Sequence, residues 1–557
     1  MKKKSHHALR FYAVCIFFIA IFMALVWRMV VLTVLDRSFL QGQGNARSIR
    51  VIDIPAYRGM ILDRNGDSIA VSTPVQSLWV NPKLFHPDPQ QLKQLAKLLN
   101  MPAKRISSYV QSVNKRGFVY LKRQLPPSDA QKIRDLHIPG LNFQQEFKRY
   151  YPDADSMAQL LGFTNIDDNG IEGLELAYQD WLFGEPGKRR VLKDRTGRVI
   201  DDLGVIQEPK PGKNLSLSID RRIQFFAYHA LQETLNKTNA RSGSVVVLDT
   251  VSQEILALAN LPSFNPNARG RYSRDNYRNK AITDTFEPGS VMKPFSIASA
   301  LETGLYTPNS IIDTNPSWMV VHGHTVRDIH NYGVLDVRGV LQHSSNVGVT
   351  KMVLSSPPEQ LINLLLRCGV GVRTESGYPG EAEGSIVSVK DANPFVLATL
   401  SFGYGVSVTT LQLAKMYSIF ANKGKLYPIR LLHYDSDSQG VQVIKPEISD
   451  QVLDMMEYVV NEGSGVPAKV PGYRVAGKTG TARIAGKNGY SERRYIASFV
   501  GVAPVSRPRL VVAVVIHEPS LSAYYAGQVA APLFAKVMGA ALRTLDIEPD
   551  QPESTTS

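Results

Sequence analysis

The stretch EPGSVMKPFSIASALE, residues 287–302, decides which fold this chain adopts. Glu287-Pro288-Gly289 is typical of the end of a loop, and the apolar spacing over residues 291–301 predicts a helix. Ser290 then lies in the first helical turn, where unpaired amides and the helix dipole favour negative charge on a serine oxygen. Lys293 follows three residues later on the same face, so its amine can reach the hydroxyl. The stretch therefore predicts an activated serine nucleophile.

Two further short motifs follow in order, Ser344-Ser345-Asn346 and Lys478-Thr479-Gly480-Thr481. S-x-x-K alone is expected by chance roughly twice in a chain of this length. Residues 112–115 are such a match, with no helical apolar run after it and no K-T-G nearby. K-T-G is expected by chance only about 0.1 times, so the ordered trio is far more specific than its parts. It predicts acyl transfer by a serine, with Lys293 as base and Lys478 as a second cation that lowers the pKa of Lys293.

Composition and charge limit the other possibilities. The chain has 557 residues, of which 44% are hydrophobic, so it can bury large cores and is expected to form two to four domains. Lys and Arg total 63 against 49 Asp and Glu, which gives a net charge of +14 that is spread over the sequence and does not indicate nucleic-acid binding. The two cysteines, Cys15 and Cys368, exclude a disulfide framework and a cysteine zinc cluster.

The N-terminus is typical of a membrane anchor. Residues 1–10 are basic and residues 11–27 carry no charge, so we expect a cytoplasmic tail and one transmembrane helix over residues 11–35. The alternative is a cleaved signal peptide, but the apolar core is longer than about 7–15 residues and no small-x-small site follows it. The positive N-terminal flank places everything after residue 35 outside the cytoplasm.

The rest of the chain predicts an α+β protein. Residues 36–215 form a mixed module that ends at a polar stretch, residues 205–213, and residues 216–545 form a second domain. Residues 546–557 are expected to be a disordered tail. One antiparallel sheet is expected from distant segments, with a helix near each end of the domain. These segments are strands over 244–248, 254–259, 474–483, 495–503 and 510–517, a helix capped by Asp220 and a closing helix over 529–545.

Three histidines raise the question of a metal. His322, His324 and His330 include an H-x-H pair, but no third ligand pattern accompanies them, so we expect loop residues near the cleft, no metal and no cofactor.

The trio resembles the active site of the penicillin-binding proteins and serine β-lactamases, and longer segments resemble class B penicillin-binding proteins of the cell-division (septal) type. Residues 285–290, 344–349 and 401–405 are similar to the septal branch, and the boxes of an N-terminal class B module are similar to residues 58–66, 162–165, 170–175 and 194–198. In that module we expect Arg58, Asp63, Glu172 and Arg198 to form structural ion pairs.

The resemblance implies a role for each motif residue. Ser290 is the nucleophile on a D-alanyl-D-alanine stem peptide and Lys293 the base that takes its proton. Ser344 relays a proton to the leaving nitrogen, and Asn346 holds Lys293 and binds the substrate amide.

The same resemblance implies a binding groove. Lys478, Thr479 and Thr481 bind the terminal carboxylate, and the backbone amides of Ser290 and Thr481 form the oxyanion hole. Three further residues of the motifs complete the substrate or β-lactam site, namely Ser345, Gly480 and Tyr404.

The implied fold is a C-terminal penicillin-binding transpeptidase domain, an antiparallel sheet flanked by helices, on an elongated N-terminal pedestal. The implied partners are stem peptides and lipid-linked nascent glycan, a membrane glycosyltransferase of the shape, elongation, division and sporulation family, bitopic divisome proteins and β-lactam antibiotics. The implied location is the inner membrane at the septum, with a periplasmic catalytic domain.

Four alternatives stay open. A β-lactamase or a D,D-carboxypeptidase hydrolyses the acyl-enzyme, and an elongation-type transpeptidase serves another site of growth. A non-catalytic sensor or scaffold keeps the pocket only for binding.

Overall fold

The computed structural model describes residues 5–194, 199–270, 272–434, 438–486, 489–520, 522 and 524–551. The chain divides into two compact units. Unit 1 comprises Met1–Tyr57, Thr73–Lys148 and Gly184–Gly212, and unit 2 comprises Arg58–Ser72, Arg149–Phe183 and Lys213–Ser557. Two stretches of the predicted N-terminal module, 58–72 and 149–183, thus fold with the C-terminal domain.

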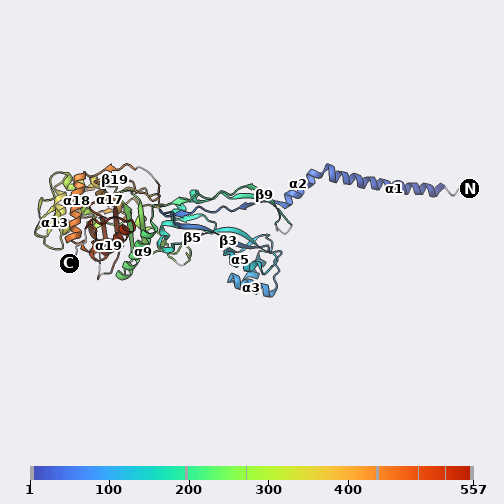
Figure 1. The fold of residues 1–557 in the computed structure, drawn as a ribbon, viewed down its shortest axis with the longest axis horizontal. Coiled ribbons are helices and arrows are strands. Elements are labelled where there is room, and N and C mark those ends of the chain that lie inside the picture. The colour runs from blue at the N-terminus through green and yellow to red at the C-terminus, as the bar shows by residue number, and fades with distance from the viewer. Residues whose placement is uncertain are drawn as a thin grey trace. The chain divides into compact units, whose positions relative to one another are not determined.

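Unit 1 begins with a long apolar helix. Helix α1 (Ser5–Val30) continues through a π-helical turn, η1 (Val31–Leu35), and α2 (Arg37–Ser48) follows (Figure 1). The stretch His7–Leu35, 29 residues, is long and apolar enough to cross a membrane, and none of its most apolar window is buried in protein. This agrees with the predicted helix over residues 11–35 and supports a single-pass anchor.

The remainder of unit 1 holds two small sheets and three helices. One sheet has the antiparallel order β1-β8-β9, built from β1 (Ile49–Ile54), β8 (Gly187–Lys193) and β9 (Val199–Gln207). In the other, residues 76–80 of β3 (Ser68–Val80) pair with β4 (Val119–Leu125), and β5 (Leu141–Tyr150) also pairs with β3. The helices are α3 (Pro89–Leu99), α4 (Ala103–Ser112) and α5 (Pro127–Arg134). The chance S-x-x-K match ends α4, where the Ser112 hydroxyl donates to the Tyr109 carbonyl.

Unit 2 contains a buried ion-pair cluster made by the early segments. Arg58 and Arg149 both bind the Glu175 carboxylate, with Nε–O distances of 2.5 and 2.7 Å, and all three side chains are buried. Arg58 therefore forms a structural ion pair, as predicted. Glu172 is not its partner, because Glu172 lies in β7 with an exposed side chain. Asp63 accepts the Asn65 amide instead of forming a predicted ion pair.

Around this cluster lie short elements of unit 2. They are β2 (Ile61–Leu62), η2 (Ala154–Ser156), α6 (Ala158–Leu161), β6 (Phe163–Thr164), β7 (Gly170–Glu172), α7 (Gly173–Ala177), α8 (Gln179–Leu182) and β10 (Leu215–Ser216). Residues 195–198, which include Arg198 and most of the last predicted box, lie outside the described residues.

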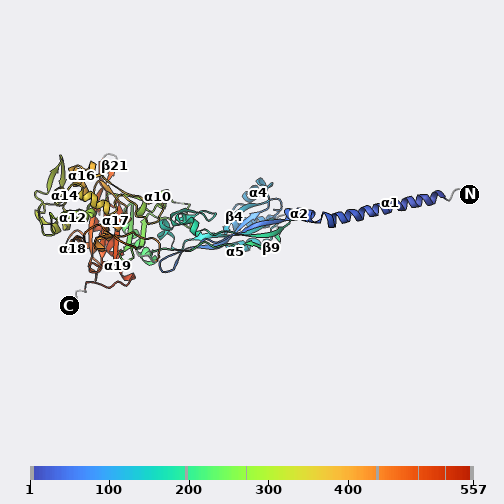
Figure 2. The same cartoon turned by 90° about the horizontal axis from the view of Figure 1, so that it is seen from above.

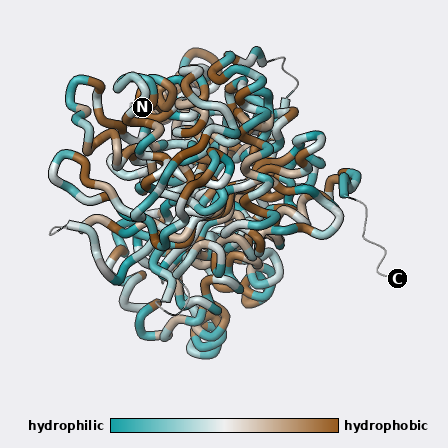
Figure 3. Tube along the Cα trace, turned by 90° about the vertical axis from the view of Figure 1, so that its left-hand side faces the viewer, coloured by the Kyte–Doolittle hydropathy of each residue, from teal (hydrophilic) through white to brown (hydrophobic). Residues whose placement is uncertain are grey.

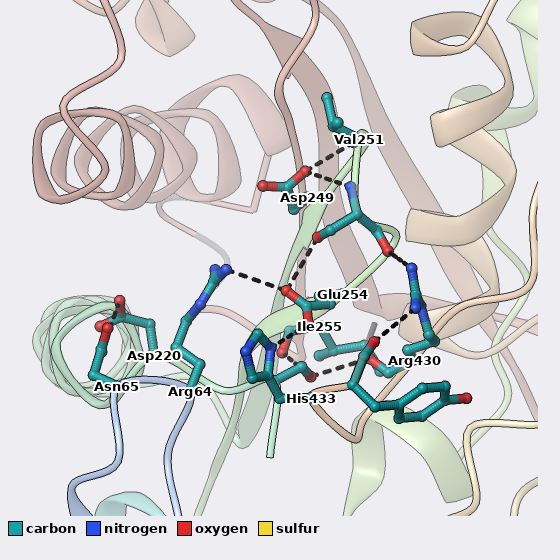
Figure 4. Close-up of polar contacts among 12 residues, drawn as sticks. Arg64, Asn65, Asp220, Asp249, Val251, Glu254, Ile255, Arg430 and His433 are labelled. Atoms are coloured by element: carbon teal, nitrogen blue, oxygen red, sulfur yellow. Dashed lines mark hydrogen bonds and ion pairs between the residues drawn. The ribbon is translucent and has the colours of Figure 1, made fainter. Parts of the chain in front are cut away.

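A second polar cluster joins residues 64–65 to the domain that follows. The buried Glu254 carboxylate contacts Arg64 Nη2 at 3.2 Å and His433 Nδ1 at 2.6 Å (Figure 4). Figure 4 also shows Arg430 beside the turn that carries Asp249, and the Arg430 Nη2 donates to the Ser252 carbonyl at 2.7 Å. This first box is thus bound to the turn between the first two strands of the main sheet.

The main sheet has five antiparallel strands in the order β12-β11-β23-β22-β21. They are β11 (Ser242–Asp249), β12 (Ile255–Leu261), β21 (Ala476–Gly486), β22 (Gly489–Ala503) and β23 (Leu510–His517), so the predicted sheet from distant segments is confirmed. Helices α9 (Arg221–Thr238) and α19 (Ala526–Thr544) lie side by side on one face (Figure 1). Asp220 caps α9 by accepting the Arg222 amide, as predicted. Strand β21 is the last strand of this sheet, and no other strand of the described residues pairs with its outer edge.

The other sheet face is covered by helices of a large core. The central ones are α12 (Lys293–Glu302) and α17 (Thr410–Ala421), which meet through Phe295 and Tyr417 (Figure 2). Hydrophobic segments gather toward the middle and hydrophilic loops toward the periphery (Figure 3). Five further helices and one hairpin lie around them. They are α13 (Val337–Gln342), α14 (Asn346–Leu354), α15 (Gln360–Arg367), α16 (Pro394–Ser401), α18 (Pro446–Glu462), and the strands β14 (Trp318–Val321) and β15 (His324–Arg327). The shorter ones are α10 (Arg274–Tyr277), α11 (Lys280–Thr283), η3 (Gly289–Met292), η4 (Val389–Asp391), η5 (Val466–Ala468), β13 (Ile311–Asp313), β16 (Val334–Asp336), β17 (Ser385–Ile386), β18 (Val406–Ser407), β19 (Lys425–Leu426) and β20 (Val441–Gln442).

The first residues of the predicted disordered tail are held by the domain. The Asp550 carboxylate accepts the Arg474 amide at 2.7 Å and the Ser506 hydroxyl at 2.8 Å. The Ile547 carbonyl accepts the Tyr473 hydroxyl at 2.6 Å. Specific polar contacts therefore order residues 546–551, and the prediction of disorder does not hold for them.

Candidate active site

Ser290 lies at the start of α12, but not in an α-helical turn. Residues 289–292 form the 3₁₀ turn η3, in which the Lys293 amide bonds the Ser290 carbonyl, and α12 starts at Lys293. The physical reason is Pro294, which has no N–H to donate to the Ser290 carbonyl as an α-helix requires. The expected first α-helical turn is therefore a 3₁₀ turn.

Lys293 points into a fully buried environment beside the second motif. Its ammonium group donates to the Ser344 hydroxyl at 3.1 Å and to Asn346 Oδ1 at 2.8 Å, and it also contacts the Ser344 carbonyl. Burial, reinforced by the charge of Lys478, holds the pKa of Lys293 well below its usual range. A lysine with a lowered pKa is neutral more often than an ordinary lysine, as a general base has to be.

Ser344 lies between two lysines. Lys478, on the edge strand β21, donates to the Ser344 hydroxyl at 3.1 Å, the same distance as Lys293. Ser344 has a φ of +58°, a left-handed conformation that is uncommon outside glycine. Contacts with the surrounding structure therefore hold the Ser344 backbone in place. Burial lowers the pKa of Lys478 to about 7. The hydroxyl can thus pass a proton between two amines.

Asp328, which the motifs do not include, anchors the second motif. Its carboxylate accepts the Ser345 hydroxyl at 2.5 Å, the Val347 amide at 3.0 Å and the Asn346 amide. The negative charge of Asp328 stabilises the start of α14, where the helix dipole is positive. The same charge raises the pKa of Lys293, whereas burial lowers it. No local pattern marks this residue, because it lies in a loop 16 residues before Ser344.

The three motifs line one cavity of 530 Å³. Ser290 and Ser344 lie on its wall together with Thr479 and Thr481 of β21. The Thr481 hydroxyl accepts the first amide of α19, from Ala526, at 3.1 Å, and the Thr479 hydroxyl is 2.6 Å from Ser464 Oγ. The remaining lining residues are Ile329, His330, Tyr332, His343, Asn346, Ser464, Tyr525, Ala526 and Gly527.

Ser345, predicted to bind substrate, is instead buried and structural. Its hydroxyl accepts the Gly348 amide at 2.8 Å and so caps α14. The sequence contains the signal for this role, because serine directly before an apolar helix is a preferred N-cap.

Gly480 and Tyr404 also lie outside the cavity lining. A Cβ on Gly480 would come within 2.9 Å of the Pro288 carbonyl oxygen, so this glycine lets β21 approach the loop before Ser290. The Tyr404 hydroxyl accepts the Arg483 amide at 3.1 Å, two residues beyond Thr481. Both residues shape the site through packing.

The three histidines have different positions. His330 lines the cavity, whereas His324 lies on β15, not in a loop, and stacks on Phe395 with ring centroids 4.1 Å apart. His322 lies in the turn between β14 and β15. Among the described residues, no group of three His, Cys, Asp or Glu is placed to hold a metal ion.

The sequence matches two known families. Residues 243–539 match the family described as the penicillin-binding protein transpeptidase domain, and residues 53–217 match the penicillin-binding protein dimerisation domain.

Similar proteins extend over almost the whole chain. A probable peptidoglycan D,D-transpeptidase, PbpC, of Pseudomonas aeruginosa is 42% identical over 97% of this chain and 96% of its own length. The peptidoglycan D,D-transpeptidase FtsI of Escherichia coli K12 is 40% identical over 99% of this chain and 95% of its own length. A solved structure of penicillin-binding protein 3 from Mycobacterium tuberculosis, complexed with aztreonam, is 26% identical with a TM-score of 0.70, and covers 90% of this chain and 99% of that one.

Proposed function

Because the chain belongs to the penicillin-binding proteins that carry a dimerisation and a transpeptidase domain, we propose that it is a septal peptidoglycan D,D-transpeptidase. The observation that carries the chemistry is the Ser344 hydroxyl, 3.1 Å from both Lys293 Nζ and Lys478 Nζ, in a cavity that Ser290 lines. Two amines and two hydroxyls there suit proton transfer during acylation and deacylation.

The first half-reaction forms the acyl-enzyme. Ser290 Oγ attacks the carbonyl between the two terminal D-alanines of a stem peptide while Lys293 takes its proton. The backbone amides of Ser290 and Thr481 stabilise the resulting oxyanion. The C–N bond then breaks, Ser344 passes a proton to the leaving nitrogen, and free D-alanine departs. Its carboxylate is held until then by Lys478 and Thr479.

The second half-reaction closes the crosslink. An amine of another stem peptide attacks the ester carbonyl, an amide forms, and Ser290 Oγ leaves with the proton that the amine loses. β-Lactams imitate the D-alanyl-D-alanine end and acylate Ser290 in the same way. The long apolar helix supports anchoring in the inner membrane. Its basic flank supports a periplasmic catalytic domain.

The proposal extends to partners. A D,D-transpeptidase acts on glycan that is polymerised elsewhere, so a membrane glycosyltransferase of the shape, elongation, division and sporulation family and bitopic divisome proteins are the expected partners.

Mass spectrometry after penicillin treatment tests the site. The full-length protein in detergent is incubated with fluorescent penicillin, and intact mass and peptide mapping locate the adduct. We expect a single stable adduct on Ser290, no labelling of Ser290→Ala, and normal labelling of Ser112→Ala. Ser112 is the matched control because it begins the chance S-x-x-K match in another unit.

Four outcomes test the site and decide among the alternatives. Labelling that survives Ser290→Ala contradicts the site, and rapid loss of the adduct favours a β-lactamase. A stable adduct in a protein that hydrolyses but never aminolyses a peptide donor favours a D,D-carboxypeptidase. Depletion in cells is expected to give filaments with blocked septa, whereas rounded cells indicate a role in elongation.

A further inference from the structure

One wall of the cavity is made of rings. Tyr332 stacks on His343, with centroids 4.8 Å apart and planes at 24°, and His330 meets Tyr332 edge-on at 6.0 Å. All three rings line the same cavity as Ser290 and Ser344. None of them belongs to the three motifs, and the two half-reactions described above use none of them.

The other walls are assigned by the proposed function, on which this inference rests. The donor peptide lies along the free edge of β21, with its reacting carbonyl near Thr481 and its terminal carboxylate near Lys478 and Thr479. The amide nitrogen that leaves is next to Ser344. The rings come from residues 330–332 and from His343, which directly precedes Ser344, and none of them belongs to β21.

The position of the acceptor follows from reversibility. Attack of an amine on the acyl-enzyme is the acylation step run backwards with a different amine, so the incoming nitrogen occupies the place that the D-alanine nitrogen left. The carboxylate site at Lys478 and Thr479 is then free. This carboxylate site fits an incoming amino acid whose α-carbon bears both the amine and a carboxylate and has the D configuration. Such a centre places its amine and carboxylate as the departed D-alanine did.

The two amines differ in their side chains. D-alanine has a methyl group, whereas the amine of a second stem peptide is attached to the rest of that peptide by a chain of several atoms. That chain has to leave the D-alanine position along a wall that neither the donor nor the motifs occupy. Exposed rings suit this contact, because they bind aliphatic and aromatic groups over a large area with little loss of conformational entropy.

We propose that Tyr332 and His343 are specificity-determining residues for the acceptor, and that their stacked rings bind its side chain. The accepted class is a D-configured amino-acid centre with free amine and carboxylate and a side chain longer than methyl. The rings act after Ser290 has been acylated. The rings therefore set the ratio of aminolysis to hydrolysis of the acyl-enzyme. They do not set the rate at which the acyl-enzyme forms.

The partition ratio tests this role directly. The full-length protein in detergent is acylated by a peptide thioester that ends in D-alanyl-thioglycolate, and mass spectrometry measures the aminolysis and hydrolysis products. The acceptors, at equal concentration, are D-alanine, D-phenylalanine, L-phenylalanine and phenethylamine, which has the ring but no carboxylate. We expect D-phenylalanine to be used roughly 3- to 10-fold better than D-alanine, and the last two to be used least.

The variants locate the effect. Tyr332→Ala and His343→Ala are expected to use D-phenylalanine and D-alanine equally, within about twofold, whereas Tyr332→Phe keeps the ring and the preference. His324→Ala is the matched control, because His324 stacks on Phe395 in the same manner outside the cavity lining. It is expected to keep the preference. Penicillin labelling of each variant reports that the domain is folded.

The results separate this inference from the proposed function. Absence of penicillin labelling at Ser290 in the parent protein contradicts the proposed function. Labelling and aminolysis without a preference for D-phenylalanine overturn the inference alone. A preference that persists in both alanine variants, or that is lost equally in His324→Ala, also overturns it.

Discussion

Unit 2 contains two buried pairs of basic side chains, and the two pairs differ in the charge of the group that they share. Arg58 and Arg149 share one carboxylate, that of Glu175, at 2.5 and 2.7 Å. Lys293 and Lys478 share one neutral hydroxyl, that of Ser344, at 3.1 Å each. In the first group a negative charge is placed between the positive ones, and in the second the shared group is uncharged.

The difference separates a structural cluster from a chemical one. A buried charge with a hydrogen-bonded partner stays charged and holds the chain segments together. A buried amine without an adjacent carboxylate loses its proton more easily, and burial lowers the pKa of both lysines. Groups with perturbed pKa values beside a cavity are candidates for proton transfer, so this contrast supports the centre that the motifs indicate.

Replacement of Lys293 is expected to have the largest effect on activity. Lys293→Met removes the base, so the rate of penicillin acylation should fall roughly 100- to 10,000-fold. The free energy of unfolding should change much less, because the loss of a buried amine without a direct ion pair offsets the hydrogen bonds that Ser344 and Asn346 lose. Stopped-flow labelling and urea unfolding measure the two quantities. Lys536→Met, which removes an exposed lysine paired with Glu233, is the control and should change neither.

Removal of the shared carboxylate is expected to have the largest effect on stability. Glu175→Gln removes the carboxylate that two buried arginines share and should lower the free energy of unfolding by about 3–5 kcal/mol. The folded variant should still be labelled by penicillin at Ser290. Glu233→Gln, at an exposed ion pair, serves as the control in the same urea titration and should show no measurable loss. Equal losses in the two variants would contradict the contrast between the clusters.

The sequence predicts most of the scaffold because its signals there are local. Strand β23 and residues 495–503 of β22 are largely apolar runs, and Asp220 is a preferred cap directly before an amphipathic helix. The ordered motifs likewise single out Ser290 and Ser344, which line one cavity, and Lys293 and Lys478, which both donate to the Ser344 hydroxyl.

The residues that the sequence does not predict are those that lie far from the motifs in the sequence but close to them in the fold. Asp328 and Tyr332 reach the site from a loop that shares no periodic pattern with the motifs. The motif implies a substrate contact for Ser345, but its hydroxyl accepts the Gly348 amide of α14 and donates to Asp328. Position within a motif does not indicate which way a side chain points.

The pH dependence of stability distinguishes the two clusters further. The pKa of Lys478 is about 7 in the folded protein and near its ordinary value of 10.5 in the unfolded chain. Between these values the unfolded state binds more protons, so stability rises with pH across this window, by at most about 1.4 kcal/mol per pH unit for one proton. Lys478→Met should lose this contribution, so its stability should rise less steeply with pH than that of the parent, in which both lysines contribute. Urea unfolding of parent and variant at about pH 7, 8.5 and 10 measures it, and a parent that loses stability relative to the variant would contradict the lowered pKa.

Replacement of Asp328 is expected to have the smallest and most specific effect on activity. Among the described residues, Asp328 is the one carboxylate found to raise the pKa of Lys293, against the effects of burial and of Lys478. Asp328→Asn keeps an oxygen for the amides at the start of α14 but removes that charge, so the pKa of Lys293 should fall further. Because Lys293 acts as a base only when neutral, the rise of acylation rate with pH should move to lower pH, by roughly one unit. Rates of penicillin labelling across a pH series measure the midpoint, with Asp313→Asn, an exposed carboxylate, as the control that should not move it. A lower rate with an unchanged midpoint would mean that Asp328 acts only by holding Ser345 and Asn346 in place.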